Sequence, residues 1–184
     1  NSYELLKTFG VKKDSIFICY NSPDTDSLFR AKQKAAELTP ILSYNAHRLI
    51  HIGRLVKWKR VDLLLHAVAD LSKSFESLEL LIIGNGPELN SLKLLAEKLG
   101  IFSKVLFVGA IYDSIEIARY FNSGGIYVLG GMGGLSINEA MAFGKAVICS
   151  VCDGTEKKLV RDGFNGYIFE NGNLESLKSK IVEL

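Results

Sequence analysis

The part of the chain best suited to chemistry is a glycine cluster followed by a serine and a glutamate, within residues 130–139. An apolar run, Ile126–Leu129, leads into the cluster, and a short helix is expected from Ser136 to Gly144. Glycine lets the backbone approach a ligand closely, and the first helical turn offers unpaired N–H groups with a positive dipole end. The segment therefore predicts an anion site, most often for phosphate, with Glu139 placed to accept hydrogen bonds from a sugar hydroxyl.

Two structural interpretations of the same residues stay open. Ser136-x-x-Glu139 is also a capping box, in which Glu139 only bonds back to the backbone of Ser136. The glycines could serve tight packing alone, because an isolated glycine cluster is a weak signal.

A basic pair stands at a second strand end. Arg54 follows Gly53 directly, and Lys59 lies five residues further on. An arginine fork with a lysine point charge can neutralise a diphosphate. The alternative is a solvated basic turn, which is how we interpret Lys57 and Arg60.

The elements that must position these residues alternate along the chain. Expected strands are Ser15–Tyr20, Arg48–Gly53, Leu78–Ile83, Val105–Val108, Ile126–Leu129, Ala146–Cys149 and Tyr167–Phe169. Expected helices are Ser27–Leu38, 59–71, 87–100, Ser114–Phe121, 136–144 and one capped by Asn173. Continuous apolar strands between amphipathic helices predict an α/β fold with a doubly wound, Rossmann-like parallel sheet.

Ligands of such sheets bind beyond the carboxyl ends of the strands. Four strand ends carry residues that look non-structural: Gly53-Arg54, Gly84–Gly86, Gly109-Ala110 and Gly130–Gly134. We expect these four strand ends to lie along one rim of the sheet.

Length, composition, charge and cysteine spacing limit the kinds of protein that this chain can be. The 184 residues are 48% hydrophobic and 23% charged, which is typical of one globular domain, assigned to residues 14–184. We interpret residues 1–13 as an interdomain connection. The net charge of +2 gives no support for a nucleic-acid partner. No signal segment or long apolar run is seen, and the Cys149-x-x-Cys152 spacing, with Cys19, favours reduced thiols over a redox or metal site.

Taken together, the motifs resemble the carboxyl-terminal half of retaining glycosyltransferases of the GT-B fold, family 4 (group 1). The matching segments are His51–Lys59 (G-R-L-x-x-x-K), Ile82–Glu88 (I-G-x-G-P), Val105–Gly109 (V-x-F-x-G), Leu135–Ile148 (G-L-x-x-x-E-A-M-A-x-G-x-P-V-I), Gly154–Glu156 (G-x-E) and Asp162–Gly166 (D-G-x-N-G). They occur in the family's order and cover nearly the whole chain.

The resemblance implies roles for single residues. Arg54 and Lys59 would hold the diphosphate of a nucleotide-sugar and act catalytically by stabilising the leaving nucleoside diphosphate. Glu139 would accept from the ribose hydroxyls, and Ala110 and Ile111 would flank the base. The full donor-binding set is Arg54, Lys59, Gly84, Ala110, Ile111, Gly133, Gly134, Leu135, Ser136 and Glu139.

Three further observations qualify these roles. The first glutamate of the family's E-x7-E motif is Gly131 here, and the motif proline is Ala146. Glu156 is expected to start a helix and is a weaker candidate for ligand contact. Asp153, which lies near it, is no stronger a candidate. The three histidines, His47, His51 and His66, read as background.

The resemblance also implies the activity of the whole protein. We expect transfer of a sugar from a UDP- or GDP-linked donor to a glycan or lipid-linked acceptor, in cell-surface polysaccharide biosynthesis, without cofactor or metal. The acceptor would sit on an amino-terminal domain absent from this chain, so the isolated domain should bind donor and transfer little. The whole protein is expected in the cytoplasm or peripherally on the inner face of the membrane. Two alternatives stay open: a degenerate, non-catalytic module, or an epimerase or phosphorylase on a GT-B-like fold.

Overall fold

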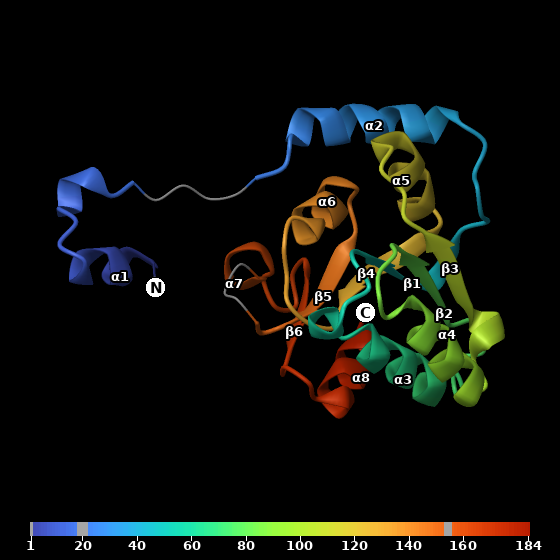
Figure 1. Cartoon of the computed structure of the whole chain (residues 1–184). Coiled ribbons are helices and arrows are strands. Elements are labelled where there is room, and N and C mark those ends of the chain that lie inside the picture. The colour runs from blue at the N-terminus through green and yellow to red at the C-terminus, as the bar shows by residue number, and fades with distance from the viewer. Residues whose placement is uncertain (1, 18–21, 153–155) are drawn as a thin grey trace.

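Six parallel strands form the sheet at the centre of the fold (Figure 1). The computed structural model describes residues 2–17, 22–152 and 156–184. The strands are β1 (Asn45–Ile52), β2 (Glu79–Ile83), β3 (Val105–Gly109), β4 (Gly124–Leu129), β5 (Ala146–Ser150) and β6 (Gly166–Phe169). Their order is β3-β2-β1-β4-β5-β6, so the expected doubly wound α/β fold is confirmed.

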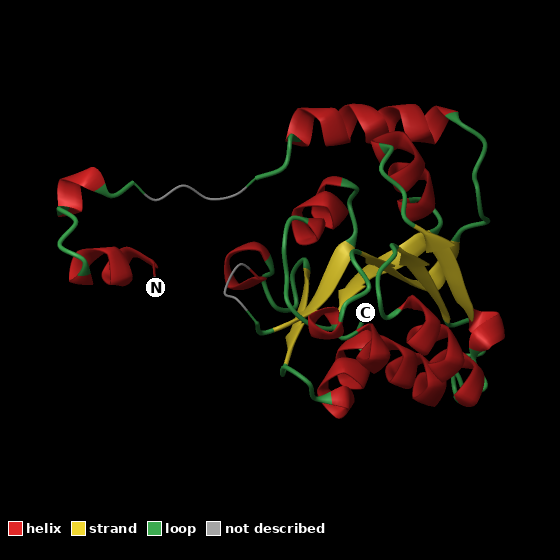
Figure 2. Ribbon diagram, viewed as in Figure 1, coloured by secondary structure: helices red, strands yellow, loops and turns green. Residues whose placement is uncertain are grey.

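Helices cover both faces of this sheet (Figure 2). The helices are α1 (Ser2–Thr8), α2 (Thr25–Glu37), α3 (Val61–Leu71), α4 (Leu89–Lys98), α5 (Ser114–Phe121), α6 (Ser136–Ala142), α7 (Glu156–Leu159) and α8 (Leu174–Val182), with 3-10 turns η1 (Lys13–Ser15), η2 (Lys57–Lys59) and η3 (Phe102–Lys104). Helices α3, α4 and α8 lie on one face, and α2, α5 and α6 lie on the other (Figure 1).

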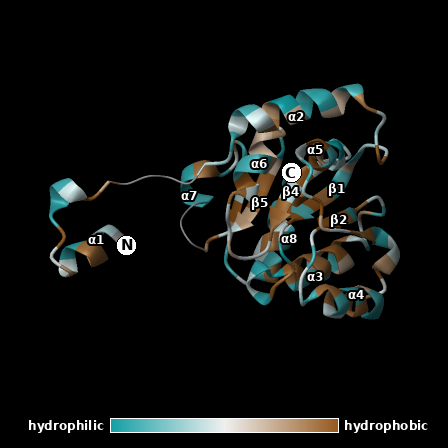
Figure 3. Ribbon diagram, turned by 45° about the horizontal axis from the view of Figure 1, so that its top comes forward, coloured by the Kyte–Doolittle hydropathy of each residue, from teal (hydrophilic) through white to brown (hydrophobic). Residues whose placement is uncertain are grey.

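Two apolar cores separate the sheet from its helices. Successive side chains of a strand point to opposite faces, so Leu49 and Val128 pack under α3 and α8, while Ile50 and Tyr127 pack under α5 and α6. The strands are accordingly apolar along most of their length (Figure 3). A sheet buried on both faces holds its strand ends rigidly, which is what a site at those ends requires.

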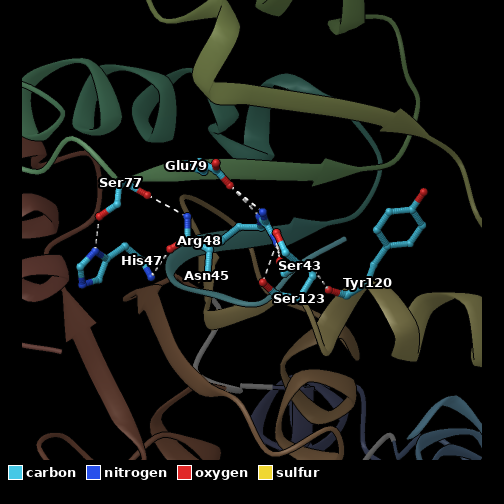
Figure 4. A network of polar contacts seen from close by, with 8 residues as sticks. All are labelled: Ser43, Asn45, His47, Arg48, Ser77, Glu79, Tyr120 and Ser123. Atoms are coloured by element: carbon cyan, nitrogen blue, oxygen red, sulfur yellow. Dashed lines mark hydrogen bonds and ion pairs between the residues drawn. The ribbon is translucent and has the colours of Figure 1, made fainter. Parts of the chain in front are cut away.

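A buried arginine fixes the opposite, amino-terminal edge of the sheet (Figure 4). Arg48 donates from Nε to the Glu79 carboxylate at 2.8 Å, and from one terminal nitrogen to the carbonyls of Ser43 and Ser123 at 2.8 and 2.6 Å. These contacts join β1 and β2 to the segments that precede β1 and β4. The network is structural and lies at the far end of the strands from the predicted site.

One expected strand is wrong in its described part. Ser15 lies in the 3-10 turn η1, and Ile16 and Phe17 belong to no strand, with Phe17 84% exposed. Residues 18–20 of that prediction lie outside the described residues. An apolar run needs a neighbouring strand for its backbone hydrogen bonds, and residues 15–17 have none. The other expected strands and helices are confirmed, with ends shifted by a few residues.

Candidate functional site

The carboxyl ends of β1, β2 and β3 are joined by backbone hydrogen bonds that their glycines donate. Gly53 donates to the Ile83 carbonyl at 3.0 Å, and Gly84 donates to the Gly109 carbonyl at 2.7 Å. A Cβ on Gly84 would lie 1.9 Å from the Gly53 carbonyl oxygen, so only glycine fits there. With β4 beside β1, the four expected strand ends do share one rim.

A shallow cavity of about 140 Å³ opens at this rim. Four of the predicted site residues line it together: Arg54, Gly84, Ala110 and Ile111. The Arg54 side chain is exposed, and no hydrogen bond or ion pair joins it to the described part of the chain. The structure therefore offers an uncommitted guanidinium beside a cavity at the ends of the strands.

Lys59 lies next to Gly53 and is held by the glycine loop. Its Nζ donates to the carbonyls of Met132 and Gly133 at 2.9 and 2.8 Å. The Cβ position of Gly53 lies 4.0 Å from the Lys59 Cε, and that of Gly134 lies 3.9 Å from its Nζ. Lys59 thus connects the end of β1 to the loop after β4, and it brings Gly133 and Gly134 into the site.

The same loop explains why residue 131 is glycine. The Met132 N–H donates to the Trp58 carbonyl at 2.9 Å, and a Cβ on Gly131 would stand 2.1 Å from that oxygen. The 3-10 turn η2 therefore docks directly on the loop backbone. The space that a glutamate at 131 would need is filled by this contact, so the packing interpretation of the glycines holds at that position.

Helix α6 begins after the loop, and its first turn is not a capping box. Its N-cap is Leu135, without a side-chain hydrogen bond, and the Glu139 N–H bonds the Leu135 carbonyl at 3.0 Å. The Ser136 hydroxyl oxygen instead accepts from the Tyr127 hydroxyl at 2.8 Å. The capping-box alternative is therefore wrong, and the Glu139 side chain is left for another role.

Glu139 is half-buried, and burial raises the pKa of its carboxyl above the ordinary value. No hydrogen bond or ion pair links this carboxylate to the residues that the structure describes. Ser136 and Glu139 stand three residues apart and so face the same side of the helix. A partly desolvated carboxylate without a donor is suited to accept hydrogen bonds from a ligand.

Sequence reasoning missed two residues of this region. Tyr127 is fully buried, and its hydroxyl lies 3.4 Å from the Ile52 carbonyl as well as close to Ser136. His51 is also fully buried, with Nδ1 3.1 Å from the Val128 carbonyl and Nε2 3.8 Å from the Cβ position of Gly53. Burial lowers the pKa of His51 to about 4, and its Nε2 has no partner among the described residues.

Glu156, Asp153 and the cysteines are the weaker candidates for this site. Glu156 does start a helix and is 1% exposed, and its Oε1 accepts from the Cys152 N–H at 3.1 Å. Asp153 lies outside the described residues. Cys149 is buried at the end of β5, and Cys152 is exposed. No helix within the described ranges has the length and apolarity to cross a membrane.

Comparison with known proteins identifies the family. The model of the glycosyl transferases of group 1 matches residues 42–184. An uncharacterized glycosyltransferase of Methanocaldococcus jannaschii is 32% identical over 145 residues, covering 76% of this chain and 36% of that protein. The chain thus spans little more than a third of that relative's length.

Two solved structures share the fold. A TarM mutant of S. aureus, in complex with Fondaparinux, alpha-GlcNAc-glycerol and UDP, has a TM-score of 0.79 and 22% identity, covering 98% of this chain and 34% of that one. Anabaena HepE, in complex with UDP and glucose, has a TM-score of 0.73 and 22% identity, covering 99% and 50%. The chain belongs to the glycosyl transferases of group 1, and its fold is that of the carboxyl-terminal half of a GT-B glycosyltransferase.

Proposed function

We propose that this chain is the nucleotide-sugar-binding domain of a retaining glycosyltransferase and that its donor is UDP-linked. One observation carries the proposal: the rim presents two uncommitted groups of opposite charge, the Arg54 guanidinium and the half-buried Glu139 carboxylate. A diphosphate requires donors and positive charge, whereas ribose hydroxyls require an acceptor. A sugar nucleotide carries both groups in one molecule.

Arg54 and Lys59 supply the positive charge in this account. Arg54 contacts the diphosphate through its fork of N–H groups, which suits phosphate geometry. Lys59 fixes the loop through the Met132 and Gly133 carbonyls and adds its charge to the site. As the bond from sugar to diphosphate breaks, negative charge grows on the leaving group, and these fixed cations stabilise that charge.

The remaining residues hold the two ends of the nucleotide. Ala110 and Ile111 line the 140 Å³ cavity with Gly84 and are assigned to the base. Glu139 accepts from the ribose, and the N–H groups of residues 134–136 face the phosphate side. The choice of uracil is supported by the two neighbouring folds that were solved with UDP.

The whole protein is proposed to pass the sugar to a glycan or a lipid-linked saccharide during cell-surface polysaccharide synthesis. Its acceptor is assigned to a second domain outside this chain, reached through residues 1–13. A cytoplasmic location, at the inner face of the membrane for a lipid-linked acceptor, is part of this proposal. No metal or cofactor is invoked, because Arg54 and Lys59 provide the charge.

A second function is favoured by one feature. Gly131 removes the first glutamate of the family motif, which fits a degenerate module that binds a sugar nucleotide without transfer. Transfer of radiolabelled sugar by the full-length protein to any membrane or glycan acceptor would exclude this alternative.

Titration calorimetry of the chain with UDP, GDP and ADP tests the proposal. Arg54→Ala is expected to weaken UDP binding by about 1.5–3 kcal/mol, the worth of hydrogen bonds to a charged group, or roughly 10- to 150-fold. Glu139→Gln, which keeps the side-chain shape, is expected to weaken UDP while leaving inorganic pyrophosphate unaffected. Arg161→Ala, at an exposed arginine before β6, is the matched control and should bind as the wild type does.

A further inference from the structure

The hydroxyl of Tyr127 spans the crevice where the strand order of the sheet reverses. It lies 2.8 Å from the Ser136 Oγ at the start of α6 and 3.4 Å from the Ile52 carbonyl at the end of β1. The ring itself has no exposed surface and packs against Phe121. A phenol in this position reaches two sides of the proposed donor site without being open to solvent.

The hydroxyls of Tyr127 and Ser136 have two possible hydrogen-bond arrangements, and one of them leaves the Ser136 hydrogen free for a ligand. Tyr127 has a single hydroxyl hydrogen, and at the shorter distance it goes to the Ser136 Oγ. Burial raises the pKa of Tyr127 far above its usual range, so the phenol keeps that hydrogen. In this arrangement Ser136 keeps its own hydrogen for another acceptor. In the reverse arrangement Ser136 donates to the Tyr127 oxygen, and Tyr127 donates to the Ile52 carbonyl at 3.4 Å.

Ser136 follows closely on the loop that holds the Lys59 ammonium. Gly134, two residues before Ser136, has its Cβ position 3.9 Å from the Lys59 ammonium. Glu139 stands on the same side of α6 as Ser136 and is an acceptor, but the capping contact between them is absent. A phosphate oxygen drawn to Lys59 would accept the Ser136 hydrogen and so favour the arrangement in which Tyr127 donates to Ser136.

We propose that Tyr127 is a positioning residue, which fixes the Ser136 hydroxyl so that Ser136 donates to a phosphate oxygen of the bound nucleotide. The inference rests on the proposed function, because it needs a diphosphate at this rim. The Ser136 hydroxyl adds a neutral side-chain donor to a site whose other groups are backbone and charged side chains. Tyr127 holds that hydroxyl in place. The contrasting role for the same contact is packing alone, in which Tyr127 only ties β4 to α6.

A double-mutant cycle in UDP affinity separates the two roles. Titration calorimetry would compare the wild type, Tyr127→Phe, Ser136→Ala and the double variant. We expect about a 10-fold loss for Ser136→Ala and about 3- to 10-fold for Tyr127→Phe, with the double variant no weaker than Ser136→Ala. Multiplying losses, or UDP affinity unchanged in Ser136→Ala, would overturn the proposal.

Two further variants, measured in the same way, make the test decisive. Ser136→Thr retains a hydroxyl and should bind UDP within about 3-fold of the wild type, which supports the role even where Tyr127→Phe folds poorly. Arg54→Ala is measured in the same series. Weak UDP binding by Arg54→Ala with full binding by Ser136→Ala removes only this inference, whereas a wild type that binds no nucleoside diphosphate removes the proposed function as well.

Discussion

Restoring the missing glutamate of the family motif, by Gly131→Glu, should damage the protein rather than improve it. A Cβ at this position would meet the Trp58 carbonyl oxygen at 2.1 Å and the carbonyl carbons of Trp58 and Lys59 at 3.0 Å. All three are backbone atoms, so relief requires the 3-10 turn η2 to move. Gly131 does not have a positive φ, so the cost is steric and not a matter of glycine's conformational freedom.

The magnitude follows from two contributions. Overpacking in a tight contact costs about 1–3 kcal/mol, and losing the hydrogen bond from Met132 N–H to Trp58 O costs about 1 kcal/mol more. The sum of about 2–4 kcal/mol corresponds to a fall in Tm of about 4–16 °C for a domain of this size. Gly131→Ala should cost most of this sum, because it carries the same Cβ but not the longer, charged end of glutamate.

Thermal unfolding, followed by circular dichroism with and without UDP, measures this effect. Moving η2 also moves Lys59, so both variants should lose part of the increase in Tm that UDP is expected to give the wild type. Met132→Ala is the matched control, because that side chain is 45% exposed and its backbone hydrogen bond is kept. A Gly131→Glu protein with wild-type Tm and UDP affinity would refute the reasoning.

Three further predictions concern stability and pH. Arg48→Met should lower the free energy of unfolding by roughly 2–3 kcal/mol in urea titration, less than for a fully buried pair because Glu79 is partly exposed, and leave UDP affinity unchanged. The pKa of His51 is about 4 in the folded state, so below pH 6.5 the unfolded state binds more protons than the folded state does. Stability should therefore fall as pH drops from about 6.5 to 4. His51→Gln should remove up to roughly 3 kcal/mol of that fall. The pKa of Glu139 is raised by burial, so stability should fall as pH rises through the window above the ordinary value of that pKa. With the proposed bond from ribose to the ionised carboxylate, UDP affinity should weaken as pH is lowered into that window. Calorimetry of Glu139→Gln should show neither dependence.

The strand ends and their glycines could be predicted because their signals are local. Apolar runs ending in Gly53, Gly84 and Gly109 predict parallel strands, and parallel strands in a doubly wound sheet bring their carboxyl ends together. The apolar run at Ser15–Tyr20 shows the limit of the same signal. Residues 15–17 match a strand pattern, yet a strand also requires a neighbour, and the sequence does not report whether one is present.

The roles of single side chains depended on contacts between different elements of the fold. Tyr127 reads as one more core residue of an apolar strand, and only the fold brings its hydroxyl to Ser136. The glycine at 131 is visible in the sequence, but the Trp58 carbonyl that demands it lies 73 residues away. The capping box failed for a related reason, because Ser136 finds its partner on the preceding strand, β4, and not within its own helix.

The central claim is that a nucleoside diphosphate binds at the carboxyl rim of the sheet. The most direct test is a titration of the ¹⁵N-labelled chain with UDP, followed through its backbone amide NMR signals. The account predicts saturable shifts concentrated at Gly53–Arg54, Gly84, Ala110–Ile111 and Ser136–Glu139, with residues around Arg48 unaffected. Shifts confined to the apolar cavity of His47, Phe75 and Ile181 at the opposite end of the sheet, or none at saturating UDP, would contradict it.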